Sequence, residues 1–367
     1  MIASVGLKPP FPQTMVMPKV LYGVSPIGLG HASRAVAIGQ QLVGRGVNVR
    51  FVTGGAASSF LRSYGLDVHN LISYPTPAEF RGRVVLSSLW YLRFWWGYKG
   101  SKGRVEKLIQ SVQPDLVVGD EEFTVLSLAV ERGIKSVMVS DELELAFARN
   151  RLTRAIERRV YKWYKELQRK VDMLIVPDFG RDTENVRYVG PVVREMRRGR
   201  EQVLSELGLP KDRKLVLVSS SGTGLGDFLL SRVLELHRKR RLGDVFLAVT
   251  GGRQRETADD VVHLGFVRDQ QDLIAASDLV ISLAGKSTID EALSSGTPII
   301  AIPLKHHFEQ EKNAMSLGFR YEDVERLDEL VKEKLGLRSE PTEFGGAERA
   351  AERMLGMLRP PMMKADV

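Results

Sequence analysis

The residues best placed to do chemistry lie in one stretch, Leu279–Ala314, where a glycine-containing turn precedes a short helix. The turn is centred on Gly285 and leaves backbone N–H groups free at the start of the helix. These groups and the positive end of the helix dipole favour a bound anion. Glu291 lies about one turn into the helix, where its carboxylate could accept hydrogen bonds from a sugar hydroxyl. An ordinary strand–turn–helix unit, whose glycines only make turns, is the alternative.

The elements around this turn predict a buried parallel sheet. Leu279–Leu283 and Ile299–Ile302 are short apolar runs rich in β-branched residues, typical of parallel strands that are buried on both faces. Between them, Ile289–Ser295 is a predicted helix with Gly296 as its C′ residue. Such a strand–helix–strand unit places the Gly285 turn at the carboxyl edge of the sheet.

A second glycine-rich turn lies near the start of the chain. The turn contains Gly28 and Gly30, follows the predicted strand Lys19–Val24 and precedes the predicted helix Ala35–Gly44. This order is that of a dinucleotide-binding fold. Two details argue against a dinucleotide: Ser33 stands where a third glycine is expected, and the next predicted strand ends without an acidic residue for the ribose.

Composition indicates a globular protein with an anionic partner. The 367 residues suffice for two domains, and 43% of them are hydrophobic and 27% charged. No apolar run reaches the ~20 residues that span a bilayer, and the N-terminal segment lacks the apolar core of a secretory signal. The absence of cysteine excludes disulfides and thiolate sites and fits a reducing cytoplasm. The formal charge of +8 favours nucleotide, nucleic acid or acidic lipid.

Predicted strands and helices alternate along the chain, which indicates an α/β protein with two similar domains and a cleft between them. We expect an N-terminal domain over residues 1–190, a C-terminal domain over 191–345, and a C-terminal helix and tail over 346–367. Gly190-Pro191 is the expected hinge, followed by a basic, solvated segment, Arg194–Arg200. The other predicted strands are Val47–Thr53, Gly65–Leu71, Leu116–Gly119, Ser136–Ser140, Met173–Val176, Val186–Val189, Leu215–Val218, Val245–Val249 and Val261–Leu264.

With both glycine turns in place, the chain resembles the GT-B glycosyltransferases over nearly its whole length. The most similar branch contains MurG, the N-acetylglucosaminyltransferase of peptidoglycan synthesis, and the UDP-glycosyltransferases. The resemblance implies two Rossmann-like domains facing a cleft, with the C-terminal helix packing back on the N-terminal domain. The residues that carry the signature are Gly285, Ser287, Thr288, Glu291, Ala292, Gly296, Pro298, Pro303, Glu309, Gln310, Asn313 and Ala314, together with Gly28, Gly30 and His31 of the first turn and Gly190, Pro191 and Val192 of the linker.

The resemblance implies a nucleotide-sugar donor, such as UDP-N-acetylglucosamine or UDP-glucose, bound by the C-terminal domain. Glu291 would take the ribose hydroxyls and the Gly285 turn the diphosphate. Glu309 and Gln310 would contact the transferred sugar, and the backbone at Val267 the uracil edge. The donor-binding residues implied in this way are Gly28, Gly30, Ser221, Gly222, Thr223, Phe266, Val267, Gly285, Lys286, Ser287, Thr288, Glu291, Glu309 and Gln310.

One position departs from the family pattern. The family usually has His or Arg two residues before the signature glycine, in contact with phosphate, and this chain has Leu283. Either Lys286 supplies the charge or the backbone amides suffice; the departure bears on which donor is used more than on whether one binds. Because no DxD-like motif lies in a plausible cleft loop, we expect no metal and no other cofactor, with the leaving diphosphate held by amides, a helix dipole and Lys286.

The resemblance further implies an inverting transfer, which needs a base for the proton of the acceptor hydroxyl. His31, in the first glycine turn, is the candidate base because an imidazole titrates near neutral pH. Asp120 lies where related plant enzymes keep an aspartate that orients this histidine. Asp141 and Glu142 end the neighbouring predicted strand and are alternatives, as a second base or as acceptor-binding groups. Purely structural roles for the histidine and the carboxylates stay open.

Residues 80–104 form a basic and aromatic stretch that indicates a membrane-facing surface. The stretch has no carboxylate and holds three of the four tryptophans. Aromatic rings at headgroup level and cations on acidic lipid suit a bilayer interface. Core aromatics beside a solvated basic face, or base stacking on nucleic acid, are the alternatives, and we expect no nucleic-acid partner. The residues assigned to this surface are Arg81, Arg83, Trp90, Arg93, Trp95, Trp96 and Lys99, with a second basic stretch at Arg149–Lys170.

Together these features predict an inverting, metal-independent glycosyltransferase that moves a sugar from a nucleotide-sugar to a lipid or polyprenyl-linked acceptor. We expect it to act as a peripheral protein on the cytoplasmic face of the cell membrane. A UDP-sugar 2-epimerase, which needs no acceptor, is one alternative. A non-catalytic subunit that binds nucleotide or lipid for a partner is the other.

Overall fold

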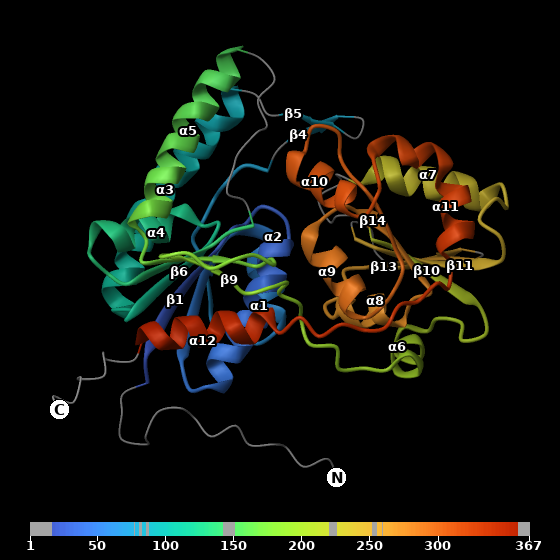
Figure 1. The fold of residues 1–367 in the computed structure, drawn as a ribbon, viewed down its shortest axis with the longest axis horizontal. Helices are drawn as coiled ribbons and strands as arrows, with labels where there is room; N and C mark the ends of the chain where they lie inside the picture. Colours follow the sequence, from blue (N-terminus) through green and yellow to red (C-terminus); the bar gives the residue numbers. More distant parts are fainter. Residues whose placement is uncertain are drawn as a thin grey trace, which may run out of the picture.

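Two parallel-rich sheets with helices around them form the framework of the molecule (Figure 1). The computed structural model describes residues 17–76, 78–80, 83–85, 88–141, 151–219, 226–251, 255–258 and 260–358. The expected alternation of strands and helices is confirmed, with each strand of the two sheets formed by one of the predicted apolar runs or by a short edge segment.

The N-terminal sheet has seven strands in the order β3-β2-β1-β6-β7-β8-β9, and every neighbouring pair is parallel. The chain reverses its direction of progress across the sheet between β1 and β6, the point where ligands bind in doubly wound sheets. The strands are β1 Lys19–Val24, β2 Asn48–Thr53, β3 Val68–Asn70, β6 Leu116–Asp120, β7 Ser136–Val139, β8 Met173–Val176 and β9 Val186–Tyr188.

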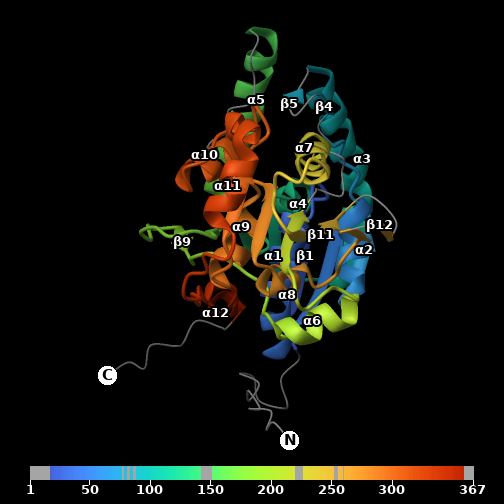
Figure 2. The same ribbon diagram turned by 90° about the vertical axis from the view of Figure 1, so that its right-hand side faces the viewer.

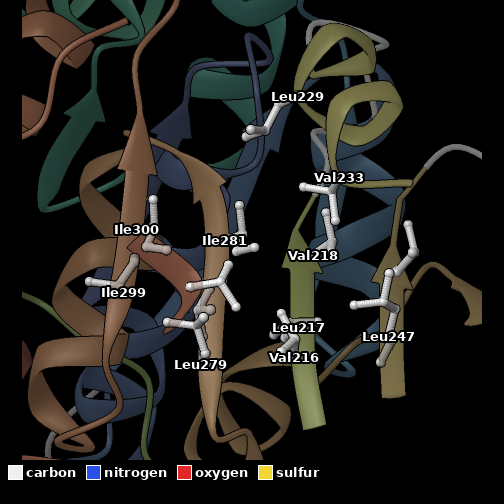
Figure 3. Packing of buried hydrophobic residues seen from close by; sticks show 14 of the residues in the cluster. Val216, Leu217, Val218, Leu229, Val233, Leu247, Leu279, Ile281, Ile299 and Ile300 are labelled. Carbon is white, nitrogen blue, oxygen red and sulfur yellow. The ribbon is translucent and has the colours of Figure 1, made fainter. Parts of the chain in front are cut away.

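The C-terminal sheet has six strands in the order β12-β13-β11-β10-β14-β15, parallel except for the short edge strand β12. Its β-branched and leucine side chains pack against the helices that cover the sheet, as the labelled residues of Figure 3 show. The strands are β10 Lys214–Ser219, β11 Val245–Thr250, β12 Glu256–Ala258, β13 Val261–Gly265, β14 Leu279–Leu283 and β15 Ile299–Ile302.

Helices connect these strands, and two of them, α3 and α5, extend well beyond the N-terminal sheet (Figure 1). The views in Figure 1 and Figure 2 agree that the end of α5 and the β4–β5 hairpin lie far from α12 and α6. The hairpin comprises β4 Ala78–Phe80 and β5 Arg83–Val85. The helices are α1 Gly30–Gly44, α2 Gly55–Ser63, α3 Ser88–Val112, α4 Phe123–Glu131, α5 Arg151–Lys170, α6 Arg200–Leu207, α7 Asp227–Arg238, α8 Gln270–Ala276, α9 Lys286–Ser294, α10 Phe308–Ser316, η1 Tyr321–Arg326, α11 Leu327–Lys334 and α12 Gly346–Leu358.

The last helix, α12, returns to the N-terminal domain, as the resemblance implied. Ala350, Ala351 and Met354 are fully buried in the same core as residues of β1 and α1. Arg45, just after α1, also reaches Glu348 at 2.8 Å. The apolar face of α12 therefore belongs to the first core, although the sequence reaches it only after the whole second domain.

Two helices begin earlier than predicted. The predicted start of α1 is Ala35, whereas the helix begins at Gly30; the predicted start of α9 is Ile289, whereas it begins at Lys286. The first turns of both helices face the other domain and carry polar side chains, so they lack the apolar period from which a helix is predicted. The glycine turns are thus shorter than expected, and several of the candidate residues lie on helices.

The connection between α9 and β15 is predicted to require glycine at position 296. Its φ is 67°, and an added Cβ would lie 2.1 Å from the Ser339 carbonyl oxygen. Gly296→Ala should therefore lower the free energy of unfolding by about 2 kcal/mol or more. Chemical denaturation followed by circular dichroism measures the change.

Gly100→Ala is the matched control, because Gly100 is an exposed helical residue of α3 with open space where an added methyl group would lie. This substitution should raise the free energy of unfolding by about 0.5–1 kcal/mol, since alanine is the better helix former. Equal stabilities for the two variants would contradict the account of Gly296.

Candidate active site

The first wall of the site lies where β1 and β6 end side by side. Val24 and Asp120 are register partners in these parallel strands, so the loop after β1 and the end of β6 reach the same edge. His31, in the first turn of α1, contacts the Asp120 carboxylate through Nδ1 at 2.9 Å. The sequence-predicted histidine and aspartate are therefore brought together, with Asp120 fully buried and His31 one-fifth exposed.

Arg34 organises this wall and was missed by the sequence reasoning. Its Nε and Nη2 donate to the two oxygens of Asp120 at 2.9 and 2.6 Å. Its Nη1 donates to Asp141 at 2.5 Å. Although burial opposes it, Arg34 holds the pKa of Asp120 below its usual range. The spacing of three residues from His31 on one helix face was the available signal.

Glu121 is the second residue that the sequence reasoning missed. Its carboxylate lies 3.6 Å from His31 Nε2, and its φ of 45° is unusual for a residue with a side chain. Burial disfavours a charged imidazole, but Glu121 and Asp120 outweigh burial and raise the pKa of His31 to about 9. The histidine is consequently protonated at neutral pH when nothing else occupies the site.

The second wall is the first turn of α9, with Gly285 as its N-cap residue. Gly285, Lys286, Ser287 and Thr288 are half-buried. Ser287 Oγ donates to the carbonyl oxygen of Gly30 at 3.3 Å. The two glycine turns predicted from sequence thus meet across the interface between the domains.

Lys286, the candidate replacement for the missing phosphate ligand, has partners of its own. Its ammonium donates to both oxygens of Asp290, at 2.9 and 3.0 Å, and lies 3.9 Å from Asp178. Burial raises the pKa of Asp290 to about 6 in spite of this contact. Leu283 itself is 7% exposed and packs in the core of the C-terminal domain.

Glu291 does not face an open ribose site in this structure. Its carboxylate is buried and paired with Arg194, with Nε to Oε1 at 2.9 Å. The prediction of a solvated Arg194–Arg200 segment is therefore wrong at its first residue, which is 6% exposed. The partner that buries Arg194 lies 97 positions along the chain, beyond the reach of any local pattern.

The remaining donor candidates surround the same turn. Gln310 accepts the N–H of Leu304 at 3.0 Å, and Asn313 donates to the carbonyl oxygen of Ala284 at 3.2 Å, so α10 is tied to the signature turn. Glu309 is half-buried in the first turn of α10.

Phe266, just before Val267, lies at the part of the site that was assigned to the uracil ring of the donor. It is 57% exposed and meets the ring of Phe60 edge-on at 5.9 Å. Val267 is half-buried beside it, and Gly28 has a φ of 76° in the first glycine turn. The candidates Ser221, Gly222 and Thr223 lie outside the described residues, as does Glu142.

The candidate membrane residues do not all share one environment. Trp90 donates to the carbonyl oxygen of Pro75 at 3.1 Å, and Trp95 stacks on Tyr98. Trp96, by contrast, is 68% exposed. Arg93 and Lys99 are also exposed, whereas Arg81 and the side chain of Arg83 lie outside the described residues. No helix within the described ranges is long and apolar enough to cross a bilayer.

Several solved glycosyltransferase structures align with nearly the whole chain. The glycotransferase of kitacinnamycin aligns over 94% of this chain and 100% of its own, with a TM-score of 0.62 and 18% identity. The spinosyn rhamnosyltransferase SpnG complexed with thymidine diphosphate aligns over 93% of this chain and 96% of its own, with a TM-score of 0.59 and 14% identity. The fold is therefore GT-B, as predicted.

Residues 18–336 match the model of glycosyl transferase family 1, and the chain belongs to this family. The predicted enzyme class, a glycosyltransferase, is thereby confirmed. An uncharacterized glycosyltransferase of Methanosarcina mazei is 27% identical over 326 residues, 81% of this chain and 82% of the relative. The UDP-N-acetylglucosamine–N-acetylmuramyl-(pentapeptide) pyrophosphoryl-undecaprenol N-acetylglucosamine transferase of Acetivibrio thermocellus is 28% identical over 229 residues, 58% of this chain and 59% of the relative.

The charge on His31 can be tested without any substrate. Nuclear magnetic resonance titration of the imidazole should give a pKa of about 9. Glu121→Gln removes the carboxylate next to Nε2 and should lower the pKa of His31 toward 6.5. The resonance is assigned from its loss in His31→Ala.

Glu131→Gln is the control, because Glu131 lies on α4 and pairs with Lys102 at 2.7 Å. It should leave the titration of His31 unchanged. A pKa of His31 near 6.5 in the parent protein would contradict the electrostatic account of this wall, and so would an unchanged value in Glu121→Gln.

Proposed function

We propose that the protein is an inverting glycosyltransferase that uses a nucleotide-sugar donor and a lipid or polyprenyl-linked acceptor. The observation that carries the proposal is the contact of His31 with the buried Asp120, next to the turn of α9 that bears the donor signature. A base and an anion-binding helix start, held on opposite domains, are what a transfer between two substrates needs. The proposed domains meet near Gly190-Pro191, with α12 belonging to the third segment, 346–367.

In the proposed reaction the acceptor hydroxyl oxygen attacks the anomeric carbon of the donor. The bond between that carbon and the diphosphate oxygen breaks, and its electron pair leaves with the diphosphate. Neutral His31 takes the hydroxyl proton on Nε2, while Asp120 holds Nδ1–H and stabilises the imidazolium that forms. The first-turn amides of α9 lie at the positive end of a helix dipole and stabilise the negative charge that develops on the diphosphate.

The proposed donor is a UDP-sugar. Support comes from the bacterial relative whose name gives UDP-N-acetylglucosamine as its donor, and from the structural neighbour with bound thymidine diphosphate, another pyrimidine nucleotide. We also propose that no metal or other cofactor takes part. The cleft carboxylates Asp120 and Asp141 already pair with Arg34, and Asp290 pairs with Lys286.

His31→Ala should reduce the turnover number at least about a hundredfold, the usual scale for loss of a general base. Release of UDP from UDP-N-acetylglucosamine or UDP-glucose, measured in EDTA with a polyprenyl diphosphate sugar as acceptor, gives the rate. UDP release that depends on the acceptor supports transfer. Epimerised sugar nucleotide without an acceptor indicates a 2-epimerase, and binding without turnover indicates a non-catalytic subunit.

His69→Ala is the matched control, since His69 lies on β3 at the far edge of the N-terminal sheet and is half-buried. It should keep parental turnover. Near-normal turnover of His31→Ala, with folding and donor binding intact, would contradict the assignment of the base.

The acceptor part of the proposal is supported by the exposed surface of α3 and α5. Leu89, Leu92 and Trp96 are 61%, 51% and 68% exposed. Their spacing of three and four residues puts them on one face of α3. Apolar side chains beside many cations suit the headgroup region of an anionic bilayer. The exposed cations of α5 are Arg151, Arg154, Arg158, Arg159, Lys162, Arg169 and Lys170.

We therefore propose peripheral binding to the cytoplasmic face of the cell membrane through this apolar stripe. The variant Leu89→Ser/Leu92→Ser/Trp96→Ser should bind vesicles that contain phosphatidylglycerol about tenfold more weakly or worse, because each fully buried apolar side chain contributes about 1.5–3 kcal/mol. Sedimentation at low and high salt measures the binding, which should weaken as salt screens the cations.

Met315→Ser provides the control, since Met315 is 62% exposed on α10 of the other domain. It should bind as the parent does. The membrane proposal is wrong if the parent protein does not sediment with anionic vesicles at low salt, or if the triple variant sediments equally well.

A further inference from the structure

Arg194 links three segments that are distant in the sequence. Its Nε and Nη2 reach the two oxygens of Glu291 at 2.9 and 3.3 Å. Its Nη1 donates to the Tyr64 hydroxyl at 2.7 Å and to the Arg268 carbonyl oxygen at 2.9 Å. The guanidinium of this linker residue thus contacts the residue that follows α2 in the first domain, and α9 and the loop before α8 in the second.

The same carboxylate is also held from α1. Ser33 Oγ donates to Glu291 Oε1 at 3.3 Å, and one turn away the Ser287 hydroxyl donates to the Gly30 carbonyl oxygen. Both oxygens of Glu291 therefore have partners, and the side chain is 3% exposed. A ribose could not form hydrogen bonds with Glu291 without displacing at least one of these groups.

A cavity large enough for a displaced guanidinium lies next to Arg194. A cavity of about 490 Å³ is lined by Arg194 together with Tyr64 and other residues of the linker, α1 and α8. The cavity lining also includes the carboxylates of Glu195, Asp269 and Asp272, which already pair with other arginines. An arginine that leaves Glu291 can therefore move into a polar space instead of an apolar core, which lowers the cost of release.

We propose that Arg194 is a positioning residue that competes with the donor for Glu291. With no donor bound, Arg194 and Ser33 hold the Glu291 carboxylate and keep α1 against α9. When a donor enters, its ribose hydroxyls replace Arg194 at the carboxylate, and the guanidinium moves into the adjacent cavity. The inference rests on the proposed function, because it takes Glu291 to be the ribose ligand of a nucleotide-sugar.

If Arg194 competes with the donor for Glu291, removing Arg194 should make the nucleotide bind more tightly. If only a fraction of the free protein has Glu291 available, the apparent dissociation constant is raised by the inverse of that fraction. Arg194→Met removes the competitor and should lower the dissociation constant of UDP about fivefold or more by isothermal titration calorimetry. Ser33→Ala should lower it in the same direction by a smaller factor, and Arg194→Lys should fall between the parent and Arg194→Met.

Arg240→Met is the control, because Arg240 lies outside the cavity lining, is 73% exposed and pairs with Asp260 at 3.0 Å. It should bind UDP as the parent does. If Arg194 were needed to orient Glu291 for the ribose, Arg194→Met would bind UDP more weakly. Weaker or unchanged binding in that variant therefore overturns the proposal.

Circular dichroism of Arg194→Met should show unchanged helix content, so that a change in affinity reports on the contact with Glu291 and not on folding. UDP binding to the parent that is not tightened in Arg194→Met overturns the role of Arg194 alone. If neither the parent nor Arg194→Met binds UDP, the proposed function fails, and the competition proposed for Arg194 fails with it.

Discussion

Charged side chains buried between the two domains have to be paired, and this requirement fixes how the domains meet. Arg34 neutralises Asp120 within the first wall, and Arg194 of the linker neutralises Glu291 of α9, where Ser33 and Tyr64 of the first domain also make contact. Removing one partner of such a pair costs about 3–5 kcal/mol, because the other charge stays buried. The sheets position the strand ends, but these arginines decide which carboxylates are available to a substrate.

The same pairing sets the chemistry that the site can do. Asp120 keeps its charge because of Arg34, so it can hold the Nδ1 side of His31 throughout a reaction. The negative charges of Glu121 and Asp120 also keep a proton on His31 in the free protein, because both raise the pKa of the imidazole. A base that is protonated before the substrates arrive has to lose its proton first. The kcat/KM, which reports on groups of the free enzyme, should therefore increase as the pH rises toward 9.

The sequence predicts the framework well because buried parallel strands are continuous apolar runs. Leu279–Leu283 and Ile299–Ile302 are observed with the predicted bounds, and the GT-B fold with its returning C-terminal helix follows from the resemblance. The starts of α1 and α9 are less predictable, because polar turns that face another domain carry no apolar period.

Pairs between distant residues were beyond prediction. Arg194 stands among other basic residues, which indicates a solvated segment, yet its partner lies in α9, 97 positions further along the chain. Likewise, local composition could not separate the packed Trp95 from the exposed Trp96, since only the contacts with α5 and the rest of α3 decide which ring is covered. Burial and long-range partners are properties of the folded chain, so the candidate residues were predictable and their present partners were not.

The central claim is that the turn of α9 and the carboxylate of Glu291 bind a nucleoside diphosphate sugar. Thermal unfolding of the full chain in the presence of UDP, thymidine diphosphate and NAD tests it most directly. A ligand that binds only the folded state raises the midpoint by an amount that grows with the logarithm of its concentration over its dissociation constant. The account predicts stabilisation by UDP or thymidine diphosphate, none by NAD, and loss of the shift in Glu291→Gln. Stabilisation by NAD, or a full nucleotide shift in Glu291→Gln, would contradict it.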